Sequence, residues 1–209
     1  MSIKQNLRLL AAFLFRSVAF NASAGFNEGL TAEKQGDLKT EFSEWKPLAE
    51  QGNAFAQYYL GMMYEYGQGV EQDYGQALAW YWKAADQGNA DAQSKLGLMY
   101  SKGRGVAQDY GQALAWHRKA AEQGNADAQY NLGVKYQFGR GVPQNDVVAY
   151  ALYNLSASID SSDDKATNNQ NSLVEHMTPA QVAAGQVLTR EMSVKGNLLK
   201  AVDQYRAHR

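Results

Sequence analysis

The sequence predicts an all-α fold, an α-solenoid built from antiparallel helical hairpins that repeat every 36 residues. Residues 52–87 and 88–123 are identical at 25 of 36 positions without a gap, and such self-similarity is typical of repeat folds. Each copy holds two stretches of helical periodicity joined by a Gly-x-Gly-Val link. The 209-residue chain is 45% apolar with only three prolines, a composition that favours helices.

The first helix of the second copy is expected from Ala90 to Lys102, with Asn89 as its N-cap and Gly103 as its stop. One helix face is apolar and forms a buried stripe of Ala92, Leu96, Met99 and Tyr100. Gly97 interrupts this helix, which costs about 1 kcal/mol in helix propensity. We therefore expect another helix backbone to pack tightly against Gly97.

The second helix of this copy is expected to begin after Asp109. Its carboxylate can accept the backbone N–H of Gln112, and the Gln112 side chain can reach back in a capping box. The inner side of the helix is formed by Ala113, Leu114, His117, Ala120 and Ala121. Among these, His117 is expected at the helix surface or half-buried, because the previous copy has Tyr81 there. One hairpin cannot bury both of its sides, so neighbouring copies must stack.

The whole chain divides into six segments. These are a signal peptide (1–24), an N-terminal capping hairpin that is a degenerate copy (25–51), three repeats (52–87, 88–123 and 124–160), and a linker with C-terminal capping helices (161–209). In the last segment, residues 161–172 read as a loop or a weak helix start. Thr178 followed by Pro179 predicts the start of a helix that covers the end of the stack.

The first 24 residues have the pattern of a secretory signal. Lys4 and Arg8 precede the apolar run from Leu9 to Phe15, and Ala22-Ser23-Ala24 fits a small-residue cleavage site. Arg16 weakens the pattern, and an amphipathic helix packed on the domain stays an alternative. The uncharged run is too short for a permanent span, so no stable membrane span is expected after cleavage. We expect a periplasmic or secreted protein.

Several motifs of the repeat point to a known family. In residues 52–87 they are Ala54/Ala56/Gln57/Leu60/Gly61/Tyr64, Gly67/Gly69/Val70 and Ala77/Trp80/Lys83/Ala84/Ala85, and matching sets lie 36 residues later. This pattern resembles the Sel-one-like repeats (SLR), relatives of the tetratricopeptide repeat. The resemblance covers residues 52–142 and implies adaptor work, in which the protein binds other proteins, in bacteria often around the cell envelope.

Comparison of the two best copies separates residues that pack within the repeat, which are identical in both, from variable residues, which we expect to be free of the structural demands of the repeat. Their first helices differ at six places only, at Phe55/Asp91, Tyr58/Ser94, Tyr59/Lys95, Met62/Leu98, Glu65/Ser101 and Tyr66/Lys102. These positions fall on one arc of about 120° of the helix face. The resemblance implies that this arc lines a concave groove.

The arc is rich in side chains that suit protein recognition. The predicted partner-binding residues are Phe55, Tyr58, Tyr59, Met62, Tyr66, Lys95, Lys102, Tyr130 and Phe138. The alternative is that some of the aromatic residues pack against the N-terminal hairpin. We expect a monomer that binds a protein or peptide in this groove, with no nucleic acid, because the formal net charge is only −1.

No catalytic, cofactor or metal site is expected. The chain has no cysteine, and its three histidines lack metal-ligand spacing. Ser-x-x-Lys occurs at Ser43/Lys46 and Ser162/Lys165, without the partner motifs of β-lactamases. The primary hypothesis is a non-catalytic adaptor of the envelope or a secreted one. The alternatives are an envelope hydrolase of β-lactamase or cell-wall type, and a secreted effector that binds a host protein.

Overall fold

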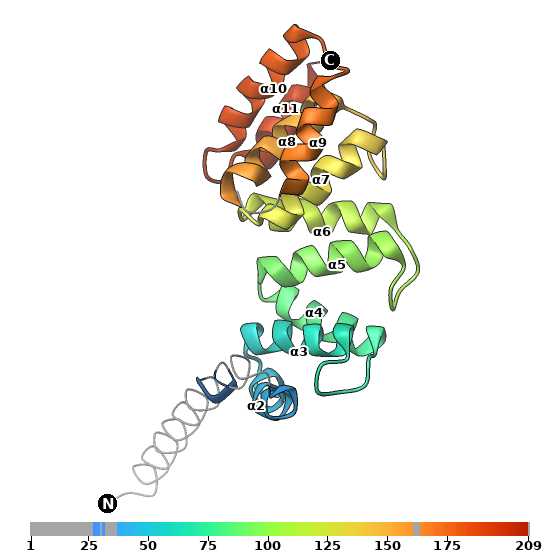
Figure 1. Ribbon diagram of the computed structural model, residues 1–209, viewed down its shortest axis with the longest axis vertical. Coiled ribbons are helices and arrows are strands. Elements are labelled where there is room, and N and C mark those ends of the chain that lie inside the picture. The colour runs from blue at the N-terminus through green and yellow to red at the C-terminus, as the bar shows by residue number, and fades with distance from the viewer. Residues whose placement is uncertain (1–26, 30, 32–36, 161–163, 209) are drawn as a thin grey trace, which may run out of the picture. The chain divides into compact units, whose positions relative to one another are not determined.

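The computed structural model describes residues 27–29, 31, 37–160 and 164–208, and within these the chain forms α-helices and no strand (Figure 1). The predicted signal peptide lies outside the described residues. The chain divides into two compact units, one up to Ala84 and one from Ala85 onward. Within each unit, successive helices pack as antiparallel hairpins of an α-solenoid, as the sequence predicts.

From residue 37 onward, the first unit is described as labelled helices. These are α2 (Leu38–Glu50), α3 (Ala54–Tyr66) and most of α4 (Tyr74–Asp86). α2 packs against α3. Their core contains the fully buried Trp45 and Leu60, together with Leu48, Ala49, Ala56 and Met63. The degenerate copy thus contributes a helix that covers the first repeat's first helix.

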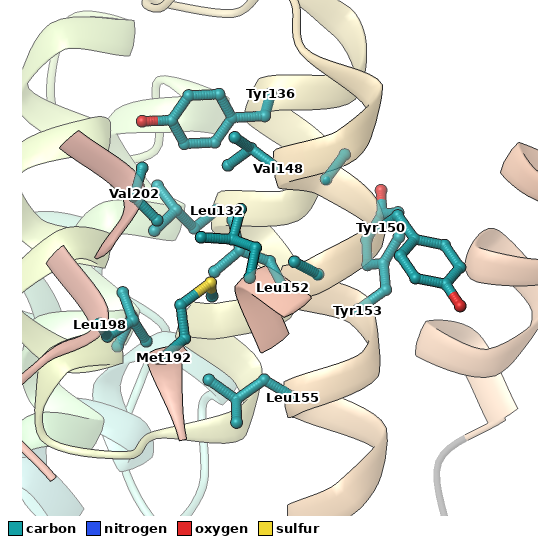
Figure 2. Packing of buried hydrophobic residues seen from close by; sticks show 14 of the residues in the cluster. Leu132, Tyr136, Val148, Tyr150, Leu152, Tyr153, Leu155, Met192, Leu198 and Val202 are labelled. Carbon is teal, nitrogen blue, oxygen red and sulfur yellow. The ribbon is translucent and has the colours of Figure 1, made fainter. Parts of the chain in front are cut away.

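The second unit contains the remaining seven labelled helices. They are α5 (Ala90–Lys102), α6 (Tyr110–Glu122), α7 (Ala126–Phe138), α8 (Asp146–Ile159), α9 (Asp164–Val174), α10 (Pro179–Met192) and α11 (Leu198–Ala207). α8 lies at the centre, in contact with α7, α9 and α10. Figure 2 shows the resulting core, in which Leu132 of α7, Leu152 of α8 and Val202 of α11 meet.

Local capping sets the length of each first helix. Asn53, Asn89 and Asn125 each accept the backbone N–H three residues ahead, and each helix is 13 residues long. Each helix ends at a glycine in the left-handed region, with φ of 67° at Gly103, where a side chain would be strained. The predicted bounds of Ala90 and Lys102 are therefore confirmed.

The second helix of the second repeat, α6, begins after Asp109 as predicted, but without the predicted capping box. The Asp109 carboxylate accepts the N–H of Gln112 at 3.0 Å as expected. The Asp109 backbone N–H, however, donates to the Tyr100 carbonyl at 3.0 Å. The prediction of a reciprocal capping box at this point is wrong, because that N–H is already used. A full capping box forms instead at α10, between Thr178 and Gln181.

The C-terminal segment is more helical than expected. The polar stretch read as a loop or weak helix start forms α9, anchored by the buried Ala166 and Leu173. α10 begins at Pro179 behind the predicted Thr178 cap and packs on α8 through Gly185 and Leu188. Asp203 of α11 accepts a hydrogen bond from Arg118 of α6 at 2.6 Å, which joins the last helix to the second repeat.

Candidate functional surface

The predicted partner-binding residues of the first repeat lie on α3, and they divide into three groups. Phe55 and Tyr59 pack on α2, where their ring centroids lie 5.7 Å and 5.3 Å from that of Trp45. Their rings also contact each other at 4.5 Å. α2 therefore covers part of the surface of Phe55 and Tyr59, which agrees with the alternative that some of the aromatic residues pack against the N-terminal hairpin. Phe55 nevertheless keeps 36% of its surface exposed.

Tyr58 belongs to the second group. Its ring lies 5.9 Å from that of Tyr81 on α4 and 5.5 Å from that of Tyr59, and it is half-buried. The equivalent Ser94 of the second repeat is buried. This edge of the arc therefore faces the repeat's own second helix, which explains why Tyr58 is only partly available to a partner.

The third group consists of Met62, which is half-buried, and Tyr66. Tyr66 is 52% exposed at the end of α3. Met62, with Tyr59, lines a pocket of about 200 Å³ between α2 and α3, whose other lining residues are Leu38, Glu41, Met63 and Gln68. An exposed aromatic ring one helical turn from a pocket with both apolar and polar lining residues provides contact area that a partner side chain can use. We call Phe55, Tyr59, Met62 and Tyr66 the α3 surface.

One position of the variable arc has a structural role. Glu65 is only 2% exposed and accepts a hydrogen bond from the Tyr81 hydroxyl at 2.7 Å. The prediction that the arc is free of the repeat's structural demands is therefore wrong at this position. The sequence contained the signal, because positions 65 and 81 change together in the next copy, to Ser101 and His117.

The predicted residues of the later repeats lie in the second unit. Lys95 is half-buried and Lys102 is exposed. Tyr130 is half-buried, with its ring 5.6 Å from that of Tyr153 and its hydroxyl accepting a hydrogen bond from Asn169 at 3.2 Å. Phe138 is 58% exposed, and the Arg140 guanidinium lies 5.2 Å from its ring centroid. Tyr130 is thus tied to α8 and α9, whereas Phe138 is open.

Sequence reasoning missed a buried polar group in the second unit. His117 is 1% exposed, so the expectation of a surface or half-buried position is wrong. Its ring occupies the space over Gly97, where an added Cβ would lie 2.5 Å from ring atoms. The glycine thus admits a side-chain ring rather than the expected helix backbone.

Lys135 lies close to this histidine. It is 3% exposed, at the position that the earlier repeats fill with Met63 and Met99, and its Nζ donates to the Ser101 Oγ at 2.9 Å. Burial and the nearby Arg140 lower the pKa of Lys135 to about 8. Burial, and next the Lys135 charge, lower the pKa of His117 to about 3, while the Ser94 backbone acts weakly in the opposite direction.

A serine beside a lysine of lowered pKa is half of a hydrolase site, yet the surroundings do not suit an oxyanion. Ser101 is in the last turn of α5, where the helix presents carbonyl oxygens and the negative end of its dipole. The Ser101 carbonyl itself accepts the Gln108 amide at 2.8 Å. The carbonyl oxygens at this helix end oppose a developing negative charge on Ser101.

The Ser-x-x-Lys motif at Ser43 and Lys46 makes other contacts in the structure. Ser43 donates to the Thr40 carbonyl at 2.8 Å, and the Lys46 ammonium lies 6.0 Å from the Phe42 ring centroid. Ser162 lies outside the described residues. Across the part of the chain that the structure describes, no cluster of side chains could hold a metal ion, and no helix is long and apolar enough to cross a membrane.

Comparison with known proteins agrees with the repeat architecture. The family model for the Sel1 repeat matches residues 54–89, 90–125 and 126–161, more than half of the chain. The chain belongs to the Sel1 repeat family. The matched units begin two residues later than the period used above and hold the same helix pairs. No curated protein matches the sequence.

Two solved structures are similar to this Sel1 repeat protein. A Sel1 repeat protein from Oxalobacter formigenes is 31% identical, with a TM-score of 0.66, and the match covers 71% of this chain and 60% of that one. A protective antigen present in uropathogenic Escherichia coli strains, which displays an SLR fold, is 28% identical with a TM-score of 0.51. That match covers 90% of this chain and 48% of the antigen.

The chain therefore spans about half to three fifths of the length of these two proteins. Sel1 repeat proteins are generally protein-interaction adaptors, and the fold is typically a non-catalytic scaffold. For this member, the family supports protein binding as the class of function.

Proposed function

We propose that this protein is a non-catalytic adaptor of the bacterial envelope, or a secreted one, that binds a protein or peptide segment through the α3 surface. The observation that carries the proposal is the pocket of about 200 Å³ lined by Tyr59 and Met62 next to the 52% exposed Tyr66. Aromatic and methionine side chains bury large areas at a low cost in conformational entropy. A partner side chain in this pocket would contact the ring of Tyr59, which is held in place by its stacking on Trp45.

The exposed Phe138 is proposed as a further contact of the same partner class, and Lys102 as a contact at the margin only, both outside the α3 surface. The location in the envelope or outside the cell rests on the pattern of the first 24 residues. An effector that binds a host protein would use the same surface and differs only in the source of its partner.

The test is affinity capture from an envelope extract with a matched pair of variants. Met62→Gln with Tyr66→Lys changes the α3 surface, and Lys is the residue that the second repeat uses at the equivalent Lys102. Trp82→Arg is the control, because Trp82 is 37% exposed on α4 and the second repeat has Arg118 there. Both proteins should keep the helical circular dichroism and cooperative melting of the wild type.

We expect the wild type and the Trp82→Arg control to capture the same partner, and the double variant of Met62 and Tyr66 to lose it. Loss of a contact centred on an aromatic residue weakens binding by at least 2 kcal/mol in favourable cases, about 30-fold. Retention of the partner at full strength by a folded double variant would place the binding surface elsewhere.

A further inference from the structure

Each repeat buries one glutamine at the same place in its first helix. Gln57, Gln93 and Gln129 are all at most 5% exposed. Their side-chain nitrogens donate to the carbonyls of Ala49, Ala85 and Ala121 at 3.0, 3.1 and 3.3 Å. These bonds fix the orientation of the amide, because a flipped amide would set its oxygen against a carbonyl oxygen. Each Oε1 is therefore an acceptor that needs a donor from elsewhere.

The second repeat shows what satisfies this acceptor. Gln93 Oε1 accepts a hydrogen bond at 2.8 Å from the side-chain amide of Gln123, the residue that caps the end of α6. The donor thus comes from a glutamine 30 residues later in the chain. In the second repeat, the protein's own side-chain carboxamide thus donates to the buried glutamine oxygen.

The third repeat lacks that donor. The residue 36 positions after Gln123 is Ile159, the last residue of α8. Among the described residues, the buried Gln129 Oε1 has no hydrogen-bond partner. A buried acceptor without a partner is unfavourable, because it has lost its contact with water and gained nothing in return.

The same glutamine lines a pocket of about 280 Å³. The pocket is bounded by the turn between α6 and α7, by the end of α8, and by the connection between α10 and α11. Its apolar wall includes Leu155, Met192 and Leu198, which come together from three helices in Figure 2. Ile159 and Val194, which also line it, are 52% and 60% exposed.

We propose that this pocket binds the side-chain carboxamide of a glutamine presented by a partner segment, with its N–H donating to Gln129 Oε1. The apolar wall accommodates the two methylene groups of such a side chain, and Lys195, also a lining residue, carries donors for the carboxamide oxygen. Glu122 Oε2 in the same lining already accepts the Leu199 N–H at 2.8 Å.

This glutamine pocket belongs to the second unit, whereas the α3 surface belongs to the first. The inference does not depend on the proposed partner of the α3 surface, and the two can fail separately.

The test is an NMR titration of the isotopically labelled full chain with three small probes. These are the N-acetyl N′-methylamides of glutamine, glutamate and methionine, which have similar length and differ in the donor. The glutamine probe should give saturable shifts of the Gln129 side-chain amide and of the Ile159 methyl groups. The other two probes should bind at least ten-fold more weakly.

A matched pair of variants provides the second arm. Ile159→Gln supplies the residue that the second repeat uses, so it should raise the melting temperature and weaken the glutamine probe at least ten-fold. Ile159→Met gives a side chain of similar length without a donor, so it should not raise the melting temperature as much as glutamine does.

Three results would overturn the proposal. The first is equal binding of all three probes, and the second is equal melting temperatures of the two Ile159 variants. The third is the absence of a saturable shift with the glutamine probe, which is expected if water alone donates to Gln129 Oε1.

Discussion

The first and second repeats pack their two helices in the same way but differ in the polar contacts between them. Both place a ring from the second helix over a glycine of the first helix, Tyr81 over Gly61 and His117 over Gly97. In the first repeat the ring carries a hydroxyl that donates to Glu65 at 2.7 Å. In the second repeat, among the described residues, neither ring nitrogen of His117 makes a hydrogen bond of normal geometry.

The third repeat has the same arrangement as the first, a tyrosine ring with a hydrogen-bonded hydroxyl. Tyr153 lies over Gly133, and its hydroxyl donates to Gln137 at 2.7 Å. All three repeats thus keep the glycine and the ring that covers it, whereas the polar partner of the ring differs between copies. In the second repeat the exchanged residue, Ser101, pairs with Lys135 of the next repeat instead.

The largest expected effect tests the assignment of helix faces in α5. Leu96 is fully buried, so Leu96→Ala should lower the free energy of unfolding by about 2–5 kcal/mol. Its neighbour Lys95 is half-buried, and Lys95→Ala should cost less than about 1 kcal/mol. Urea unfolding of both variants measures the difference. Equal losses would mean that the two faces of α5 are assigned the wrong way round.

A smaller effect is expected when the first repeat is given the second repeat's residue. Glu65→Ser removes the acceptor of the buried Tyr81 hydroxyl, which should cost about 1–3 kcal/mol. The double variant Glu65→Ser with Tyr81→Phe removes the donor as well and should recover part of that loss. Thermal unfolding of the three proteins provides the test. A double variant less stable than the single one would contradict the role of this hydrogen bond.

The pH dependence of stability should distinguish the two repeats further. Burial lowers the pKa of His117 to about 3, against about 6.5 in the unfolded chain. Between these values the unfolded chain binds a proton that the folded chain does not, so stability falls as the pH falls through this window. The contribution of one such group is at most about 1.4 kcal/mol per pH unit.

His117→Tyr is the matched variant, since tyrosine fills this position in the other repeats. Its stability should depend less steeply on pH than that of the wild type between about pH 6.5 and pH 4, as measured by denaturant unfolding at each pH. Parallel curves would show that His117 is not held neutral in the folded protein.

The helices could be predicted from the sequence because their signals are local. Asn89 and Gly103 bound α5 through contacts with residues of their own helix, and the Thr178 cap sets the start of α10 in the same way. The polar pairs could not be predicted from such signals, since Glu65 and Tyr81 are 16 residues apart and Ser101 and Lys135 are 34 residues apart. Contacts at this distance depend on how helices pack.

The candidate surface was predicted in part. A comparison of copies located the variable residues on α3, of which Tyr66 is exposed and Met62 half-buried, whereas Glu65 is buried. It could not show that Trp45 of α2 would occupy one side of Phe55 and Tyr59, because α2 belongs to a degenerate copy with little resemblance to the others.

The most direct test of the account is site-specific photocrosslinking at equivalent positions of the two repeats. A photoreactive phenylalanine analogue would replace Tyr66 in one protein and Lys102 in another, since both side chains are exposed at the end of their helices. Binding centred on the α3 surface predicts a crosslinked partner protein at position 66 in much higher yield than at position 102. A yield at position 102 that equals or exceeds the yield at position 66 would contradict binding centred on the α3 surface.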